Sequence, residues 1–413
     1  MNRGGNSGGV TMATTKAKWP SVRLEELAEF RNGVNYNKSS FGEGVKVVGV
    51  SDFQDYSKPR YAELEQINPE GIVTERNILR DGDIIFVRSN GNRELIGRSL
   101  FIEQPPEEIT HSAFTIRLRF SSREVHPKFY AYCFRTPLIR QSLTAQGGGT
   151  NINNLNQDIL NSLVVPVPPL PVQRRIAGIL SAYDELMENS QRRIRILEAM
   201  ARALYREWFV HFRFPGHEKL PRVASPLGDI PNGWEVKLVK DILSRCAAGT
   251  VYREADVKPE GAIPVLDQST DEFLGFHDNE PDHSASAAKP MAIFGDHTCK
   301  MQLLIEPFSV GPNVVPFAAS QELPTAYAFY AVNSLVQTQE YKRHWIPLNA
   351  KEIVVADCAT AHRFASLIQP MLVAQEALRK AIRNLRRTRD LLLPRLLSGQ
   401  VELRGQARSL LAK

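Results

Sequence analysis

The sequence predicts an α+β protein built as a duplicated unit, in which each of two globular segments is followed by a long helix. Three observations predict this fold. An apolar seam of helical period occurs twice, short strand-like runs lie between turn signals, and proline-rich stretches divide the chain. The two helices match each other closely enough to suggest a pseudo-two-fold internal repeat.

The first seam lies between about 173 and 209 and has apolar residues at alternating steps of four and three. The pattern returns 188 positions later, with Ser190, Gln375 and Arg389 as polar exceptions. The seam residues are Ile176, Leu180, Tyr183, Met187, Ile194, Leu197, Ala201, Leu204 and Trp208, then Phe364, Ile368, Met371, Leu378, Ile382, Leu385, Leu392 and Leu396. A period of about 3.5 residues sustained over roughly five heptads is typical of a coiled coil.

The bulk composition is that of a folded protein with room for two or three domains in 413 residues. Its net charge of +6 is compatible with a nucleic-acid partner but does not demonstrate one. Four widely spaced cysteines favour free thiols over disulfides or a zinc site. With no signal-peptide pattern and no long apolar run, we expect a cytoplasmic protein.

Composition shifts divide the chain. A linker with four prolines and three glycines separates the two halves. The expected divisions are a disordered tail (1–18), a first globular domain (19–170), a long helix (171–212), the linker (213–233), a second globular domain (234–358), a second long helix (359–400) and a tail (401–413).

Local patterns place some elements within the first domain. Strand-like runs occur at Val45–Val50, Asp83–Val87 and Phe114–Leu118, while Leu24–Phe30 and Lys128–Arg135 resemble helices.

The chain resembles the DNA-specificity subunits of type I restriction–modification systems. The most specific motif is Pro168-Pro169-Leu170-Pro171-Val172-Gln173-Arg174-Arg175-Ile176-Ala177, at the start of the first long helix. Further matches are the Trp19 and Trp234 openings, the Trp208-Phe209 helix end, Phe294-Gly295-Asp296-His297-Thr298, and Leu392-Leu393-Pro394-Arg395-Leu396-Leu397-Ser398-Gly399. The second half departs from the pattern: Asp357-Cys358-Ala359-Thr360-Ala361-His362 replaces the proline-rich motif, and Pro370 lies either near the helix start or at a kink.

The resemblance implies that each globular segment is a target-recognition domain for one half of a bipartite site in double-stranded DNA. It also implies that the long helices pack antiparallel and set the spacing. The subunit would hold no cofactor and catalyse nothing. It would dock adenine methyltransferase subunits and, through them, restriction/translocase subunits, and S-adenosylmethionine, ATP and magnesium would bind to those partners.

Base readout needs paired donors and acceptors on loops that reach the groove. Arg88, Ser89, Asn90, Asn92 and Arg93 follow a predicted strand and turn at Asn-Gly, although an ordinary polar hairpin has the same pattern. Weaker candidates combine basic, hydrogen-bonding and aromatic groups. They are Thr150 and Asn151 after three glycines, then Tyr252, Arg253, His297, Thr298, Lys300, Lys342 and Arg343 in the second segment.

The second long helix carries eight basic and two acidic residues between 363 and 398, a net +6. Contact with phosphates or with acidic partners explains this charge no better than a solvated face does.

Two other classes of protein remain as alternatives. A catalytic DNA enzyme would need a methyltransferase active-site run or an ATP-binding loop, and the sequence contains neither. A homodimeric coiled-coil scaffold would use the same heptads but would bind no specific DNA sequence.

Overall fold

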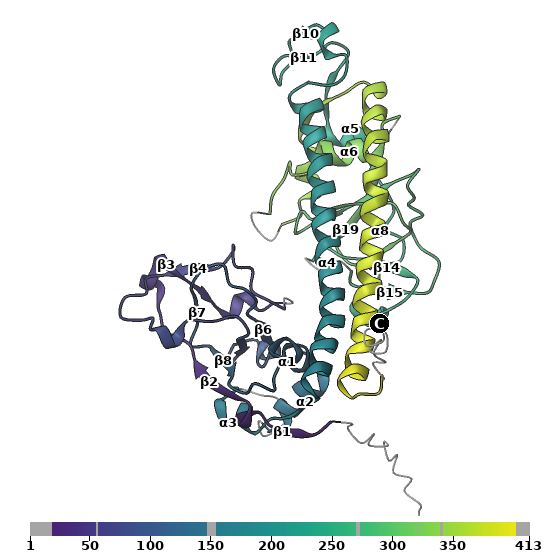
Figure 1. Ribbon diagram of the computed structural model, residues 1–413. Coiled ribbons are helices and arrows are strands. Elements are labelled where there is room, and N and C mark those ends of the chain that lie inside the picture. The colour runs from purple at the N-terminus through teal and green to yellow at the C-terminus, as the bar shows by residue number, and fades with distance from the viewer. Residues whose placement is uncertain are drawn as a thin grey trace, which may run out of the picture. The chain divides into compact units, whose positions relative to one another are not determined.

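The computed structural model describes residues 19–54, 57–146, 154–269, 273–320, 322–338 and 342–401. The chain forms two compact units, residues 1–186 with 385–413 and residues 187–384. Unit 1 thus contains the beginning of α4 (Leu170–Tyr205) and the end of α8 (Cys358–Leu397), and unit 2 contains the remainder of both helices (Figure 1).

Unit 1 is an α+β domain with two main sheets. The sheet orders are β2-β8-β5-β6 and β4-β3-β7, and β1 pairs with β9 beside them. The strands are β1 (Ser21–Arg23), β2 (Ala28–Asn32), β3 (Phe41–Val48), β4 (Glu65–Ile67), β5 (Ile84–Val87), β6 (Ser99–Phe101), β7 (Ile109–His111), β8 (Thr115–Phe120) and β9 (Val164–Pro166). The short helices are α1 (Pro127–Phe134), α2 (Pro137–Gln146) and α3 (Gln157–Ser162).

Unit 2 repeats this plan. Its sheet orders are β13-β19-β16-β17 and β15-β14-β18, and β12 pairs with β20 as β1 pairs with β9. The strands are β12 (Glu235–Leu238), β13 (Leu243–Arg245), β14 (Ile263–Leu266), β15 (Gly275–His277), β16 (Met291–Gly295), β17 (Met301–Leu304), β18 (Ser309–Val310), β19 (Val314–Ala319) and β20 (Glu352–Val355). The short helices are α5 (Val239–Ile242), α6 (Thr325–Val332) and α7 (Trp345–Asn349). Within the predicted linker, β10 (Arg222–Val223) and β11 (Ile230–Pro231) form a small hairpin.

Alternation along β8 explains the core of unit 1. Ile116 and Leu118 are fully buried on one face, while Arg119 on the other face donates two hydrogen bonds of 2.7 Å to the buried carboxylate of Asp83. This paired geometry compensates for removing the Asp83 charge from water.

The helix predicted at Leu24–Phe30 is wrong. The structure has a single 3-10 turn at Leu24–Glu26, followed by strand β2. Apolar residues at positions 24, 27 and 28 imitate a helical face, but pairing of β2 with β8 along five residues overrides that local pattern. Phe114 also lies just before β8 rather than inside it.

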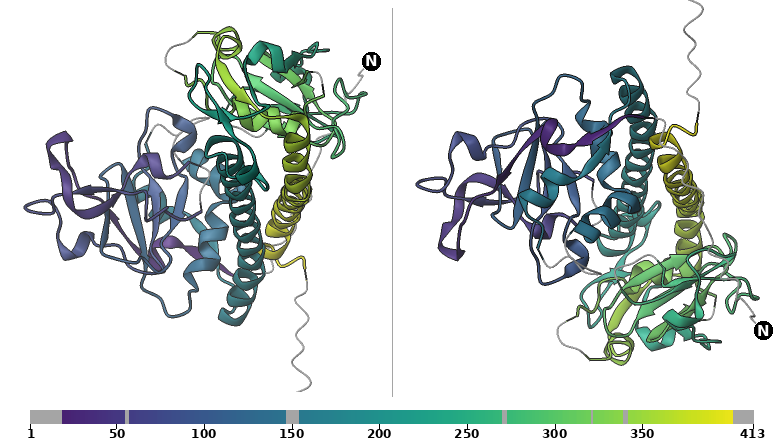
Figure 2. Two further views of the ribbon diagram at one scale, coloured as in Figure 1. Left: turned by 90° about the horizontal axis from the view of Figure 1, so that it is seen from above. Right: turned by 90° about the horizontal axis from the view of Figure 1, so that it is seen from below.

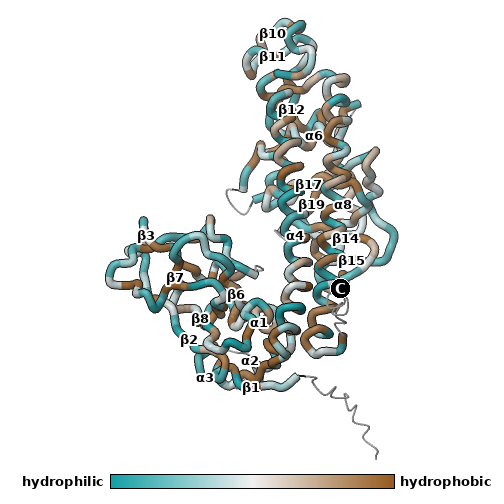
Figure 3. The backbone as a smooth tube through the Cα atoms, viewed as in Figure 1, coloured by the Kyte–Doolittle hydropathy of each residue, from teal (hydrophilic) through white to brown (hydrophobic). Residues whose placement is uncertain are grey.

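The predicted seam is internal to the helix pair within each unit. All seventeen seam residues, from Ile176 to Trp208 and from Phe364 to Leu396, are buried or half-buried. The hydropathy colouring shows hydrophobic residues recurring along both helices (Figure 3). In unit 1, Ile176 and Leu180 pack in the same core as Leu396, and in unit 2, Ala201 and Trp208 pack with Phe364.

In each unit, an ion pair and the shared core together show that the helices run antiparallel. The Arg389 guanidinium pairs with Asp184 in unit 1, and Arg379 lies 3.1 Å from Glu198 in unit 2. Later positions on α4 therefore face earlier positions on α8, and both helices can be followed in two further views (Figure 2). The polar exception Arg389 is thus explained by a charge on the facing helix. Gln375, the other exception in the second seam, is 3% exposed.

The family motif at the start of α4 has a structural explanation in Gln173, which is fully buried. Its Nε2 donates to the carbonyls of Glu124 (2.9 Å) and Pro168 (2.8 Å), and its Oε1 accepts the backbone N–H of His126 (2.8 Å). One side chain therefore fastens the first turn of the helix to the loop before α1. A buried amide with all three partners is stabilising, whereas loss of a partner would leave a costly unpaired group.

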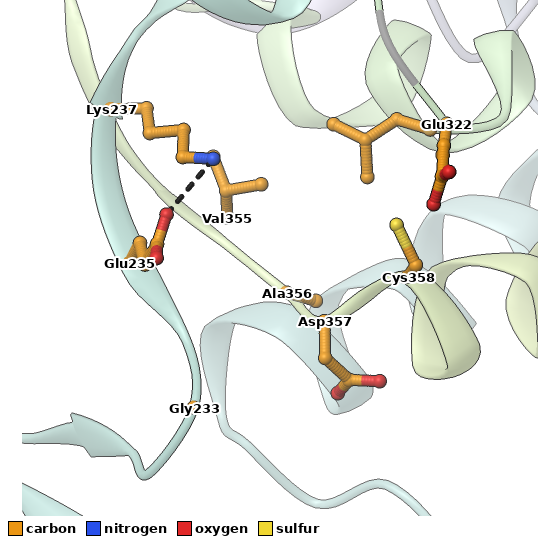
Figure 4. Close-up of a pocket in the computed structure, with 9 residues that line it drawn as sticks. Gly233, Glu235, Lys237, Glu322, Val355, Ala356, Asp357 and Cys358 are labelled. Atoms are coloured by element: carbon orange, nitrogen blue, oxygen red, sulfur yellow. Dashed lines mark ion pairs between the residues drawn. The ribbon is translucent and has the colours of Figure 1, made fainter.

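The second helix begins differently. Asp357 precedes α8 and accepts bonds from the Thr360 N–H (2.9 Å), the Thr360 hydroxyl (2.7 Å) and the Trp234 indole Nε1 (3.1 Å). This cap does in unit 2 what Gln173 does in unit 1, because it ties the helix start to the domain. Figure 4 shows Asp357 beside a polar pocket of about 410 Å³ that also contains the Glu235–Lys237 ion pair. Pro370 lies inside α8 rather than at its start.

The two neighbours Leu367 and Ile368 offer a matched test of the seam. Ile368 is fully buried in the unit 2 core, whereas Leu367 is 48% exposed on the same helix. We expect Ile368→Ala to lower the free energy of unfolding by about 2–5 kcal/mol, because it removes buried methyl groups and leaves a cavity. Leu367→Ala should change it by no more than about 0.5 kcal/mol. Denaturant unfolding of both variants measures the difference, and equal effects would contradict the seam.

Candidate nucleic-acid interface

The loops after β2, β3, β5 and β7 meet at one edge of unit 1. Strands β2 and β5 both run antiparallel to β8, so their carboxyl ends lie where β8 begins. Strands β3 and β7 are parallel, and Val34 bridges to Ser112 beside them. We call residues 33–37, 49–53, 88–92 and 112–114 the first loop edge.

Backbone hydrogen bonds join these loops to one another. The N–H of Arg88 donates to the Phe114 carbonyl, and the N–H of Leu155 donates to the Arg88 carbonyl, both at 2.8 Å. Val34 N–H also donates to His111 O at 2.8 Å. A close approach at Gly33 makes this packing possible, since a Cβ there would lie 2.1 Å from the His111 oxygen. The edge is therefore a bonded platform rather than a set of independent loops.

Two asparagines of the predicted reading loop are held by their side-chain oxygens. Asn90 Oδ1 accepts the N–H of Asn92 at 2.6 Å, and Asn92 Oδ1 accepts the N–H of Glu94 at 3.0 Å. Each carboxamide is thereby oriented with its oxygen inward, which presents its amide nitrogen as a donor. Arg88, Ser89 and Asn90 are half-buried and Asn92 is exposed, while the side chain of Arg93 lies outside the described residues, as do Thr150 and Asn151.

The same edge is built again in unit 2. Strands β13 and β16 run antiparallel to β19, and Val251 bridges to Val310 as Val34 bridges to Ser112. The N–H of Asp296 donates to Asn313 O (2.9 Å), and the N–H of His344 donates to Asp296 O (2.8 Å). We call residues 248–253, 267–269, 296–300, 311–313 and 342–344 the second loop edge.

Most residues predicted in the second segment therefore come together on one edge. Arg253, Thr298, Lys342 and Arg343 are exposed, and His297 and Lys300 are half-buried. Tyr252 differs, because it is 7% exposed and its ring stacks on His277 at 4.3 Å. Its side chain supports the loop from inside.

Hydrogen bonds fix the His297 loop. Its backbone N–H donates to Gln268 Oε1 (3.0 Å), and its Nδ1 lies 3.1 Å from the Lys342 carbonyl, which can only accept. Nδ1 is therefore the protonated nitrogen. The Asp296 carboxylate accepts the N–H groups of His344 (3.0 Å) and Trp345 (2.9 Å), which joins the same loop to the start of α7.

At least four of the eight basic residues of α8 are paired with carboxylates. Arg379 and Arg383 pair with Glu198 and Glu376, Lys380 lies 2.9 Å from Glu306, and Arg389 pairs with Asp184. The sequence left two explanations of this charge open, contact with phosphates or acidic partners and a solvated face. These four cations are paired with carboxylates of the chain, which weakens the explanation by phosphate contact. In the described part of the chain, no group of three or more His, Cys, Asp or Glu side chains is placed to hold a metal ion.

Sequence reasoning missed the hollow beside the first loop. It is about 470 Å³ in volume and has Tyr36, Glu65 and the 60% exposed Phe114 among its lining residues. These residues are far apart in sequence, so only the pairing of β3, β4 and β7 brings them together. The one local sign of this hollow in the sequence was Phe114, an aromatic residue in the turn between β7 and β8.

The repeated edges define a class of protein with two similar domains that each present a polar loop surface. Residues 16–199 match the family described as Type I restriction modification DNA specificity domain. The chain is 28% identical over 313 residues to the putative type I restriction enzyme MjaX specificity subunit of Methanocaldococcus jannaschii, covering 72% of this chain and 69% of that protein. The MjaIX specificity subunit of the same organism is 26% identical over 313 residues, with 67% and 69% covered.

A solved structure agrees in fold. The type I restriction–modification S subunit from M. genitalium superimposes with a TM-score of 0.55 at 15% identity, over 93% of this chain and 97% of that one. The resemblance indicated by the sequence motifs is confirmed: residues 16–199 match the DNA specificity domain of type I restriction–modification systems, and the chain is similar to their specificity subunits. The relatives carry the names of specificity subunits rather than of catalytic ones, in agreement with the sequence prediction. Among the described residues, no helix is both long and apolar enough to cross a membrane.

A buried histidine supports the first loop edge and gives it a pH dependence. His111 is fully buried, its Nδ1 lies 2.9 Å from the Thr115 hydroxyl, and burial together with Arg117 lowers its pKa to about 3. Because the folded-state pKa is below the ordinary value near 6.5, the unfolded chain binds the extra proton first. We expect unit 1 to lose stability as the pH falls from about 6.5 toward 3.

The variant His111→Gln cannot take up that proton. Its unfolding free energy, measured by denaturant titration between pH 7 and pH 4, should fall less steeply than that of the wild type. Identical slopes for the two proteins would show that His111 does not carry this dependence.

Proposed function

We propose that the chain is a non-catalytic subunit that recognises a bipartite target in double-stranded DNA, with each unit reading one half. The observation that carries this proposal is the pair of loop edges. They share strand order, bridges and connecting hydrogen bonds, yet they present different side chains. A common frame with different polar residues suits two readers of different sequences.

The side chains on the two edges suit groove contacts of different kinds. Asparagine and arginine on the first edge match the paired donors and acceptors of adenine and guanine in the major groove. Threonine, histidine and lysine on the second edge combine base-edge hydrogen bonds with phosphate contact. We therefore infer that the two half-sites differ in sequence.

The long helices support a spacing role. With 36 residues, α4 is about 54 Å long at roughly 1.5 Å per residue, compared with about 34 Å for a turn of B-DNA. Both helices continue from one unit into the other, and the seam is packed in each unit. A packed helix pair resists bending, as a spacer between two readers must.

Partner subunits complete the proposed function. We infer docking of adenine methyltransferase subunits and, through them, restriction/translocase subunits, which would carry the S-adenosylmethionine, ATP and magnesium. The relatives support this as named parts of type I restriction enzymes. Since the seam residues are internal, docking on the helices would use their outer face, where Ile196 and Met200 are 52% and 49% exposed.

The packed seam disfavours the alternative of a homodimeric scaffold. Heptads need a partner helix, and here each helix finds one within the same unit. A scaffold would form a stable dimer of free chains without sequence-specific DNA binding. Sedimentation of the purified chain, together with binding to randomised duplexes, separates the two functions.

The substitution Asn92→Asp tests the first reader. An aspartate keeps an oxygen to accept the Glu94 N–H but loses the amide donor. In the complex with methyltransferase subunits, adenine-methylation profiling should show discrimination at one position of one half-site reduced by roughly 5-fold, the low end for a base contact, because a single donor is lost. Thr298→Val is the matched variant for the other half-site. Changes in both half-sites from either variant, or in neither from both, would contradict the assignment.

A heptad insertion tests the spacing role. Seven residues inserted after Leu186 in α4 and after Asn384 in α8 preserve the seam phase and leave each unit intact. The insertion lengthens each helix by about 10 Å, so the gap should lengthen by no more than about three base pairs. Both half-site sequences should be retained in the methylation profile. An unchanged gap with full activity would rule out the helices as the spacer.

A further inference from the structure

The hollow on the first loop edge has the character of a binding pocket. Six of the residues that line it carry the argument: Tyr36, Glu65, Ser89, Asn90, Ser112 and Phe114. They come from the loops after β2, β5 and β7 and from strand β4. The volume of about 470 Å³ is lined in part by Asn90 of the proposed reading loop.

Gly49 lines the pocket, and we call Gly49 with the three polar groups around it the floor. A Cβ at Gly49 would lie 3.6 Å from the Ser51 hydroxyl and 3.7 Å from both the Tyr36 hydroxyl and Asp52 Oδ2. Burial raises the pKa of the Tyr36 phenol and of the Asp52 carboxyl, so the phenol stays protonated and can donate at neutral pH. The floor therefore offers fixed polar groups instead of apolar surface.

Phe114 stands at the rim with 60% of its surface exposed. Its backbone is fastened, because its N–H donates to the Ser112 hydroxyl (3.2 Å) and its carbonyl accepts the N–H of Arg88 (2.8 Å). Folding leaves an aromatic side chain exposed here at a cost in hydrophobic burial. An exposed ring on a fastened backbone beside a polar pocket can contact the thymine methyl group of an adjacent base pair.

The charge of the pocket selects its occupant. Of the ten described residues that line it, only Glu65 is charged, and its side chain is exposed on β4. A carboxylate repels phosphates, so this part of the edge cannot serve to hold the DNA backbone. A carboxylate does accept a hydrogen bond from the exocyclic amino group of a base.

We propose that this pocket receives the edge of a cytosine, through its exocyclic amino group, in the half-site that unit 1 reads. Glu65 accepts from the amino group, Asn90 lies alongside, and Phe114 packs against the neighbouring base pair. The inference rests on the proposed DNA-reading function and adds the chemical class of base at one position.

The second loop edge lacks these side chains at the corresponding backbone positions. The residue whose carbonyl accepts the connecting N–H is Asn313 in place of Phe114, and the donor is Asp296 in place of Arg88. The pocket therefore distinguishes the first reader from the second, and its loss should leave the second half-site untouched.

The test uses the full chain in complex with its methyltransferase subunits and a library of duplexes randomised over the target. Glu65→Gln removes the charge and adds a donor at nearly constant shape. We expect the preference for cytosine at one position of one half-site to fall by roughly 5–150-fold and adenine to gain there, because a carboxamide pairs with adenine. Glu70→Gln, an exposed carboxylate outside the pocket, is the matched control and should select the wild-type motif.

A second variant addresses the pocket floor without touching charge. Gly49 has φ −100°, which alanine adopts readily, and its new methyl group would meet only ordinary van der Waals distances. Gly49→Ala should therefore fold normally, as thermal unfolding will show, yet weaken selection at the same position as Glu65→Gln.

The outcomes distinguish a failure of the pocket proposal from a failure of the proposed DNA-reading function. A bipartite motif selected unchanged by both Glu65→Gln and Gly49→Ala overturns the pocket proposal while leaving the proposed function standing. The same holds if Glu70→Gln relaxes the motif as much as Glu65→Gln. If the wild-type complex selects no bipartite motif, the proposed function itself is wrong.

Discussion

The rest of the structure depends on the packing of α4 against α8, because a helix of 36 residues with an apolar row is stable in water only when that row is covered. The chain covers it internally. In each unit the seam residues are buried or half-buried, and the ion pairs Asp184–Arg389 and Glu198–Arg379 fix the antiparallel direction. With the seam satisfied in this way, the helices need no second copy of the chain, and their exposed faces are left for other partners.

The domains are fastened to these helices by polar contacts that differ between the two units. Gln173 uses a buried amide in unit 1, whereas Asp357 uses a capping carboxylate and the Trp234 indole in unit 2. Both arrangements join the first turn of the helix to its domain, so the same mechanical result comes from different chemistry. This explains why the family motif is present before α4 and absent before α8 without any loss of the repeat.

Sequence periodicity predicted the seam well, because burial of one helix face makes apolar residues recur with the helical period. The same reasoning failed at Leu24–Phe30, where β2 pairs with a strand about ninety residues later and no local pattern records the pairing. The loops around Arg88 and His297 were predicted from residue type alone. Their common position was not, since it follows from sheet order, and neither were the interior place of Tyr252 and the pocket of Glu65 and Phe114.

The basic residues of α8 show that charge counted in the sequence is not all available for binding in the folded chain. The second helix holds a net charge equal to that of the whole chain, which suggests a basic track for DNA. In the folded chain, at least four of its eight basic residues pair with carboxylates, so these cations stabilise the helix and its contacts within the units. The first loop edge instead combines few charges with fixed hydrogen-bonding groups. Under the proposed function, nonspecific attraction to phosphates at this edge would be modest, and a larger share of the binding free energy would depend on base contacts, as discrimination between sequences requires.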